Sequence, residues 1–500
     1  MKTIHSITLL CTIAICTNSF AQVSINWQSD VGANRDEGFK KICISNDGGF
    51  LAAGTSGSNT SRFKTEPSRG GHDYWVIKYD ANGQIVWDKT IGGNKDDILF
   101  TAISTKDNGY LLAGSSSSDA SGEKTSNSYG FADYWLVKLD AVGNIQWDKT
   151  IGSEFSEVVV DANETNDGGY ILLGDLGLTK TDNLGNVQWQ NPALSTVTTF
   201  YRSVQQTKKG DYVLGGDTLI FNGQVFFYPS LLKTDEFGNP KSRKFFTGLA
   251  TDNASHQALV MKDQSILIFG IARVDQSKSY QFAIDVLKLD KHANQLWRYT
   301  SNEFDSFYIQ TPVIVQPDKN GDYIFGGGYQ PKDESGGNPD YIIGKIDSLG
   351  NKKWQRIIRG DNVDEFSDLK IKGTNHYIVG GTSVSGEGED KTKPGLGNGD
   401  YWIVSAFDTT SNNIAFTTKS SSFDITKSSA IIFYPNPVKD ILHIQSTVKA
   451  TITLINQSGK IILTTTLNGN KEINVSHLPA GLYYLKNTET SAVQKIIITK

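Results

Sequence analysis

The internal repeat restricts the fold of this chain more than any other feature of its sequence. Asp73–Gly92 reads DYWVIKYDANGQIVWDKTIG, and Asp133–Gly152, 60 residues later, reads DYWLVKLDAVGNIQWDKTIG. A second unit, such as Asp47–Gly54, precedes each copy. Degenerate copies bring the first unit to seven, at Leu178–Trp189, Leu231–Pro240, Asp285–Trp297, Asp340–Trp354 and Asp400–Phe416. Such a repeat predicts an array of similar structural modules.

Each repeat contains short apolar or alternating runs separated by turn residues. An Asp-Gly-Gly or Asn-Gly pair lies between the first two runs of most repeats, and it is typical of a tight hairpin that needs positive φ. A segment such as Asp140–Asn144 plays the same part between the last two runs. Four antiparallel strands per repeat, without helical periodicity, predict an all-β fold: a seven-bladed β-propeller, with eight blades or an open solenoid as alternatives.

The two ends of the array indicate how the ring closes. Ser24–Ser29 contains Trp27 and resembles an isolated copy of the last strand of a blade, while the Asp400 strand has no unit of the second kind after it. We therefore expect the N-terminal strand to complete the last blade, which would leave no unpaired strand edge there.

The first residues predict export. Lys2 gives a positive start, 7–15 is apolar but too short to span a bilayer, and small residues precede a cleavage site between Ala21 and Gln22. Residues 1–21 are thus a predicted signal peptide, and no transmembrane segment is expected in the mature chain. A lipid anchor on Cys16 is an alternative that Ile15 before it does not favour.

The amino-acid composition bears on two questions: whether the mature chain can form a disulfide and whether it binds nucleic acid. The mature chain would keep only Cys43, so it cannot form an intramolecular disulfide, and we expect Cys43 to be a small buried apolar residue. The 48 Lys and Arg against 53 Asp and Glu give a net charge of −5 without a basic cluster. Nucleic acid is therefore not an expected partner.

The C-terminal part differs from the repeats in composition and in sequence pattern. We assign 22–416 to the propeller, 417–429 to a Ser- and Thr-rich linker and 430–500 to a small β-sandwich of alternating runs broken by turns. Three blocks stand out in this last segment: Tyr434, Pro435, Asn436 and Pro437; Leu478, Pro479, Ala480, Gly481, Leu482 and Tyr483; and a basic end at Lys500.

These blocks resemble, in order and spacing, the type A C-terminal sorting domain of the Bacteroidetes type IX secretion system. The resemblance implies that the domain binds the secretion machinery, directs transport across the outer membrane and is then removed. The cargo would be secreted or held at the outer-membrane surface. The repeats also resemble uncharacterised secreted repeat proteins of that phylum, for which no activity is implied.

The repeats contain no recognisable catalytic or cofactor site. Residues that recur in every blade are better explained by blade construction, so we interpret the tryptophans as core packing. Lys78 and its equivalents each precede an Asp by two positions, and we interpret them as blade-to-blade or strand-end ion pairs. His and Cys lack metal-ligand spacing, and the Asp-rich turns lack the ligand pattern of a calcium loop. We therefore predict no catalytic residue, no metal and no cofactor.

Three polar insertions are the better candidates for function. Residues 56–73, 115–133 and 382–400 separate the second and third strands of three repeats, which are neighbours if the ring closes as proposed. Such a loop face can bind a glycan or a protein, although spacer loops are an equal alternative. The sequence favours a non-enzymatic binding or adhesion module, with a polysaccharide-degrading glycosidase or lyase as the alternative.

Overall fold

The computed structural model describes residues 23–194, 198–221, 225–247, 255–273, 282–301, 312–330, 338–409, 431–434, 438–446, 449–456, 461–487 and 493–499. The chain forms two compact units, Met1–Ile414 and Ala415–Lys500. The predicted signal cleavage at Ala21 and Gln22 and the predicted linker lie outside the described residues, so the predicted domain limits stay predictions.

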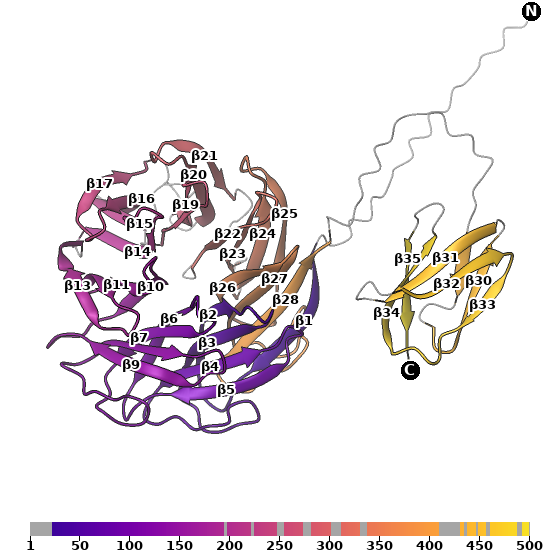
Figure 1. Ribbon diagram of the computed structural model, residues 1–500, viewed down its shortest axis with the longest axis horizontal. Coiled ribbons are helices and arrows are strands. Elements are labelled where there is room, and N and C mark those ends of the chain that lie inside the picture. The colour runs from indigo at the N-terminus through magenta and orange to yellow at the C-terminus, as the bar shows by residue number, and fades with distance from the viewer. Residues whose placement is uncertain are drawn as a thin grey trace, which may run out of the picture. The chain divides into compact units, whose positions relative to one another are not determined.

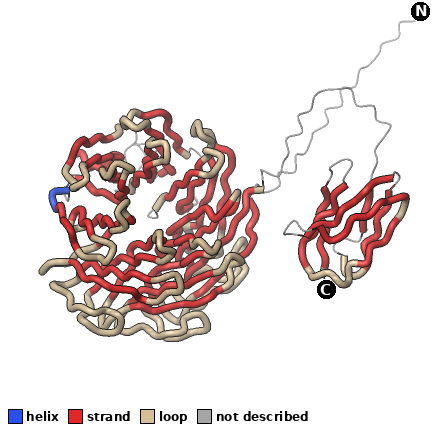
Figure 2. Tube along the Cα trace, in the orientation of Figure 1, coloured by secondary structure: helices blue, strands red, loops and turns tan. Residues whose placement is uncertain are grey.

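Seven four-stranded antiparallel sheets, the blades, form a ring in the described part of the first unit (Figure 1). Figure 2 shows that strands and loops make up almost the whole of this ring. Blade 1 contains β2 (Glu37–Ile44), β3 (Phe50–Ser56), β4 (Asp73–Tyr79) and β5 (Ile85–Ile91); blade 2 contains β6 (Asp97–Ser104), β7 (Tyr110–Ser116), β8 (Asp133–Leu139) and β9 (Ile145–Ile151); blade 3 contains β10 (Val159–Glu164), β11 (Tyr170–Gly174), β12 (Gly177–Thr181) and β13 (Val187–Asn191).

The next three blades follow the same order, after a single turn of 3-10 helix, η1 (Pro192–Leu194). Blade 4 contains β14 (Thr199–Gln206), β15 (Tyr212–Phe221), β16 (Val225–Thr234) and β17 (Pro240–Phe245); blade 5 contains β18 (Gln257–Val260), β19 (Ile266–Arg273), β20 (Phe282–Leu289) and β21 (Gln295–Thr300); blade 6 contains β22 (Ile314–Pro317), β23 (Tyr323–Tyr329), β24 (Asp340–Ile346) and β25 (Lys352–Ile358).

Blade 7 joins the two ends of the ring. It contains β26 (Asp364–Gly373), β27 (His376–Ser383), β28 (Asp400–Asp408) and, as its outermost strand, β1 (Val23–Val31). β1 lies antiparallel to β28, with Val23 opposite Asp408 and Val31 opposite Tyr401. The predicted closure is confirmed, and the ring has seven blades in place of the alternative eight.

The turns confirm the predicted backbone geometry. Between the first and second strands, Gly48 and Asn108 have φ of 79° and 68°. Between the third and fourth strands, Gly143 has φ of 84°. Asp140 Oδ1 accepts the backbone N–H groups of Val142 and Asn144 at 3.0 and 2.8 Å, so the turn aspartate holds the hairpin closed.

The recurring tryptophans pack the blades together, as predicted. The third-strand residues Trp75 and Trp135 are fully buried, and Tyr74 Oη of blade 1 donates a hydrogen bond to the carbonyl of Trp135 in blade 2 at 3.0 Å. The fourth-strand Trp87 covers the turn of the next blade, where a Cβ on Gly143 would lie 2.8 Å from its ring. These rings are therefore committed to contacts between blades.

The recurring lysines form ion pairs, but with partners that the sequence interpretation did not name. The spacing pointed to the Asp two residues on, such as Asp80 for Lys78, or to a partner on a neighbouring blade. The structure pairs Lys78 Nζ with Asp47 Oδ2, in the turn between the first two strands, at 2.8 Å. Equivalent pairs join Lys138 to Asp107, Lys180 to Asp167 and Lys345 to Asp318 at 2.7, 2.9 and 2.8 Å. Among the described residues, Lys233 and Lys288 lack such a pair, so the prediction is wrong for these two.

The C-terminal unit consists of two antiparallel sheets. One has the order β29 (Ile431–Tyr434), β30 (Ile441–Ser446), β33 (Lys471–Asn474), and the other β32 (Ile461–Asn468), β31 (Lys449–Asn456), β34 (Gly481–Asn487), β35 (Val493–Ile498). Leu442 and Ile444 of the first sheet share a buried core with Ile452 and Leu454 of the second. This is the predicted β-sandwich.

Candidate functional site

The second block of the predicted sorting motif divides into a buried and an exposed part. Leu478 and Tyr483 are buried, and Tyr483 Oη donates a hydrogen bond to the carbonyl of Pro479 at 3.0 Å. Pro479, Ala480 and Gly481 lie exposed between them, before β34. The anchors thus fix the shape of a surface turn.

Two other residues of the sorting motif lie in strands of the C-terminal unit. Tyr434 ends β29, opposite His443 of β30, and Leu482 lies in β34, opposite Ile497. Pro435, Asn436, Pro437 and Lys500 lie outside the described residues.

A cavity of about 460 Å³ lies on the ring axis between the first strands of the blades. Its lining includes the charged residues Lys41, Asp161 and Lys370. Asp161 Oδ2 accepts the backbone N–H of Val204, on the next blade, at 2.9 Å. Burial raises the pKa of Asp161 to about 6, against the opposing attraction of Lys41. This carboxylate joins two first strands.

Asp368 plays the same part at the blade 7 to blade 1 junction. It is fully buried and accepts the backbone N–H of Ile42 at 2.8 Å, that of Leu369 at 2.9 Å and Lys370 Nζ at 3.0 Å. A glycosidase needs two carboxyl groups that face the substrate. Of the carboxylates in the described part of the ring, only Asp161 lines the cavity.

The three insertions lie next to one another on one face of the ring, which we call the insertion face (56–73, 115–133 and 382–400). Gly399 O accepts the Glu37 N–H of blade 1 at 2.9 Å, and His72 O accepts the Asp97 N–H of blade 2 at 2.6 Å. Arg69 pairs with Glu123 across two insertions at 2.8 Å. The predicted neighbourhood of the insertions is confirmed.

A buried lysine anchors each insertion to its blade. Lys124 Nζ donates to the carbonyl of Ser126 at 2.7 Å and to Thr150 Oγ1 at 2.9 Å, and Asp148 accepts the backbone N–H of Thr125 and the Trp135 indole N–H. Lys64 and Lys391 are the buried lysines of the other two insertions, and Lys391 lies 2.7 Å from Asp30. Burial lowers the pKa of Lys64 to about 8. The insertions are therefore held in a defined conformation by internal hydrogen bonds, which argues against spacer loops.

The insertion face ends at an exposed aromatic cluster, consisting of Tyr129, Phe131 and Phe155. Their exposed fractions are 68%, 75% and 66%, and the Phe131 N–H donates to the carbonyl of Phe155 at 3.3 Å. Blade 3 has no insertion, because only Asp175 and Leu176 join β11 to β12, so no neighbouring loop lies beyond the cluster.

The aromatic cluster is a departure from the repeat. The equivalent positions of blades 1 and 2 carry Arg69, Gly71 and Lys95. Blade construction therefore does not require these aromatic rings. The sequence interpretation missed them because it looked for what recurs, whereas a comparison of the two near-identical repeats would have revealed the three differences.

No metal-binding group of three or more His, Cys, Asp or Glu side chains is found in the described ranges. Within the same ranges, no helix has the length and apolar character of a membrane span.

The ring and the C-terminal sandwich define the class: this is a β-propeller protein with a small β-sandwich domain after the ring. Residues 432–499 match the family described as the secretion system C-terminal sorting domain. The chain therefore carries the sorting domain of type IX secretion cargo, which indicates secretion or the cell surface. Its ligand is not established by this match.

The solved structures to which this chain is similar share little sequence with it. A protein of unknown function from Bacteroides caccae is 13% identical, covering 61% of this chain and 93% of that chain with a TM-score of 0.36. The Neurospora crassa Pan2 WD40 domain is 11% identical, covering 62% and 89%, with a TM-score of 0.36. YCF48, solved with a D1 peptide, is 10% identical, covering 81% and 100%, with a TM-score of 0.43. A search of the curated proteins gave no match.

Proposed function

We propose that the propeller is a non-enzymatic binding or adhesion module for a glycan or a protein, and that the insertion face is its contact surface. The observation that carries the proposal is the aromatic cluster, because Tyr129, Phe131 and Phe155 expose rings that the fold does not require. Rigid aromatic side chains on a braced loop are typical anchors of recognition, since little side-chain entropy is lost when they bind.

We also propose the limits and signals expected from the sequence: signal cleavage between Ala21 and Gln22, the propeller in 22–416, a linker in 417–429 and the sorting domain in 430–500. Within the last, the exposed turn at Pro479–Gly481 and the entry at Tyr434–Pro437 would be read by the secretion machinery. The buried side chains of Leu478 and Tyr483 would hold that turn in shape.

The rival function, a polysaccharide-degrading enzyme, has less support. Two carboxyl groups facing one substrate would favour it, and the axial cavity contributes Asp161 alone from the described residues. The same binding experiment separates the two functions if product release is scored independently of binding.

The experiment uses the chain from Gln22 to Lys500 and panels of immobilised polysaccharides and surface proteins. The test variant is Tyr129→Arg, Phe131→Gly and Phe155→Lys together, which introduces the residues that the equivalent positions already carry. We expect a ligand of the wild type to bind this variant at least about tenfold more weakly, as for loss of interface anchors, with thermal unfolding unchanged.

The matched control is Phe237→Asn. Phe237 is 60% exposed in a turn of blade 4 away from the insertion face, and blade 1 carries Asn82 at the same position. Equal binding by the triple variant and the wild type would overturn the proposal, and so would release of oligosaccharide products by the wild type.

A further inference from the structure

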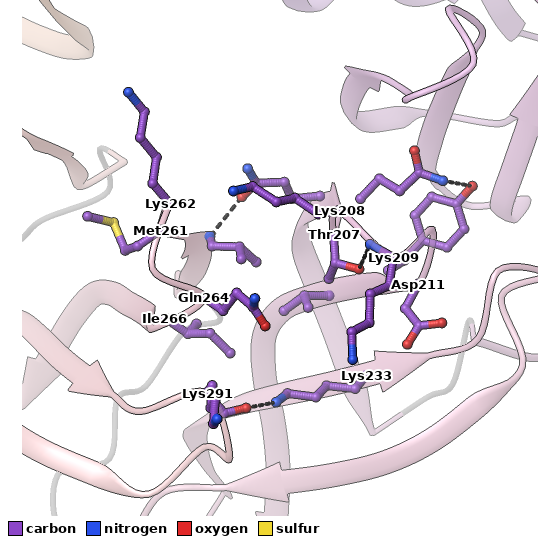
Figure 3. Close-up of a pocket in the computed structure, with 15 residues that line it drawn as sticks. Thr207, Lys208, Lys209, Asp211, Lys233, Met261, Lys262, Gln264, Ile266 and Lys291 are labelled. Atoms are coloured by element: carbon purple, nitrogen blue, oxygen red, sulfur yellow. Dashed lines mark hydrogen bonds between the residues drawn. The ribbon is translucent and has the colours of Figure 1, made fainter.

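A second recessed site lies between blades 4 and 5. It is a pocket of about 390 Å³, which we call the lysine pocket, and it is formed by the turns opposite the insertion face. Five lysines line it: Lys208, Lys209, Lys233, Lys262 and Lys291 (Figure 3). The carboxylate of the lining is Asp211, and its Oδ1 is paired with Lys241 at 2.9 Å. The pocket is therefore strongly cationic in a chain whose net charge is negative.

The charge arises from a broken ion pair of the repeat. In blades 1 to 3 the residue before the positive-φ turn position is an aspartate, such as Asp47, which neutralises the third-strand lysine, such as Lys78, at 2.7 to 2.9 Å. In blade 4 this turn residue is Lys209, before Gly210 with φ of 98°, and the third-strand lysine is Lys233. A carboxylate has been replaced by a second ammonium group.

Lys233 consequently forms no salt bridge with a carboxylate of the described residues; Asp290 attracts it from farther away, and burial still lowers the pKa of Lys233. Its Nζ donates one hydrogen bond, to the carbonyl of Lys291 across the blade boundary, at 2.7 Å (Figure 3). An ammonium group has three donors, so a ligand in the pocket could accept from the two that this hydrogen bond does not use. A half-buried cation that lacks a carboxylate in direct contact is stabilised by an anion that enters.

The rest of the lining combines an apolar floor with polar side chains, a combination that suits a sugar ring and its hydroxyl groups. Val213 and Ile266 are buried and form an apolar floor beside Val260 and Met261. Amide and hydroxyl groups of Gln206, Gln264 and Thr207 lie around it. An apolar floor with convergent polar groups is typical of small-molecule sites of this volume. The stacking platform that single-stranded nucleic acid needs is not seen here, because Tyr212, the aromatic residue of the lining, is buried.

We infer that the lysine pocket is a binding site for an acidic saccharide, in which the sulfate or carboxylate group of a sugar takes the place of the aspartate that blades 1 to 3 supply. This site is independent of the insertion face, because the two are formed by opposite ends of the strands. Lysine, a flexible point charge without the planar fork of arginine, suits either kind of anion.

The test compares dextran sulfate with dextran, which differ only in their sulfate groups, on the chain from Gln22 to Lys500 at low and at physiological salt. We expect dextran sulfate to bind the wild type and dextran not to bind. Lys209→Asp should restore the ion pair of blades 1 to 3, keep the protein folded and weaken binding of dextran sulfate at least about tenfold. Lys233→Gln should weaken it as well.

Lys319→Asp is the matched control. Lys319 occupies, in the turn of blade 6, the position that Lys208 has in blade 4, and its replacement changes the net charge as Lys209→Asp does. An equal loss of binding in Lys319→Asp would mean general charge attraction and would overturn the assignment. Failure of the wild type to bind dextran sulfate at low salt would overturn it too. Equally tight binding of a thymidine oligonucleotide, lost in the same variants, would contradict a saccharide site. The triple aromatic variant should bind dextran sulfate as the wild type does, so the two proposals fail separately.

Discussion

His256 lies at the centre of a buried ionic network between blades 4 and 5. Its Nδ1 is 2.7 Å from Asp217 Oδ1 and its Nε2 is 3.4 Å from Asp285 Oδ2, while Arg298 Nε lies 2.7 Å from Asp285. Asp285 occupies the position of Trp75 in blade 1. Where the aromatic contact between blades is lost, a chain of buried charges replaces it.

This network predicts a pH-dependent stability. Burial lowers the pKa of His256, but the charges of Asp217 and Asp285 outweigh it and raise the pKa from 6.5 to about 9. The stabilisation is therefore complete below pH 6.5 and is lost as the pH rises toward 9. His256→Gln should lower the free energy of unfolding at pH 6.5 by about 3 to 5 kcal/mol, because it leaves buried carboxylates unpaired.

Denaturant unfolding between pH 6 and 9 checks this prediction. The difference between His256→Gln and the wild type should shrink as the pH approaches 9. His292→Gln is the control, because His292 is exposed on a turn of the same blade. A difference that stays constant over this range would show that His256 is not protonated in the folded protein.

At the scale of residues, the burial of a side chain was easier to predict from the sequence than its ion-pair partner. Burial of Trp75 and Cys43 follows from apolar alternation, and both are buried. The partner of Lys78 did not follow, because Asp47 is 31 residues away and meets it only once the strand register is set. The lysine pocket was missed for the same reason, although Lys209, at a position that carries Asp in blades 1 to 3, was visible in the sequence.

The hairpin turns are the elements whose chemistry is most constrained. Gly143 and Gly168 have almost the same φ, 84° and 82°. They differ in their surroundings, since a Cβ on Gly143 would lie 2.8 Å from the ring of Trp87, whereas a Cβ on Gly168 would meet nothing within 4 Å. The pair therefore separates the cost of backbone strain from the cost of lost contact between blades.

We predict that Gly168→Ala lowers the free energy of unfolding by about 1 to 2 kcal/mol, the cost of a left-handed conformation. Gly143→Ala should lower it by about 1 to 3 kcal/mol more, because Trp87 has to move. Chemical denaturation of both variants gives the comparison, and equal losses would refute the interpretation of Trp87 as the clamp between blades 1 and 2.

At the scale of elements, the sequence predicted strands, turns and the neighbourhood of the insertions, since local turn residues and repeat order determine these. The sequence did not show whether the insertions are ordered loops with internal hydrogen bonds or unstructured spacers. The anchor Lys124 is buried by Thr150 and by carbonyls of its own insertion, and such partners cannot be read from a polar composition. Likewise, exposure of Phe131 depends on the missing insertion in blade 3.

At the scale of the whole molecule, the sorting domain and the ring are two compact units, and the sorting domain has a core of its own. We predict that a chain ending at Ser429 keeps a folded propeller but is retained in the periplasm. Cell fractionation with immunoblotting measures the location, and cooperative thermal unfolding of the purified truncated chain confirms the fold. Appearance of the truncated chain in the medium at wild-type level would contradict a role of residues 430–500 in export.

Blade 7 contains strands from both ends of the ring, so the order in which the chain is synthesised affects when the ring can close. β1 leaves the ribosome first, yet its hydrogen-bonding partner β28 is the last strand of the ring to be made. Every shorter nascent chain therefore presents bare backbone at two places, and contacts this distant in sequence form slowly. A polypeptide that still lacks β28 cannot pair β1, so the circle can close only after the last strand of the ring is present.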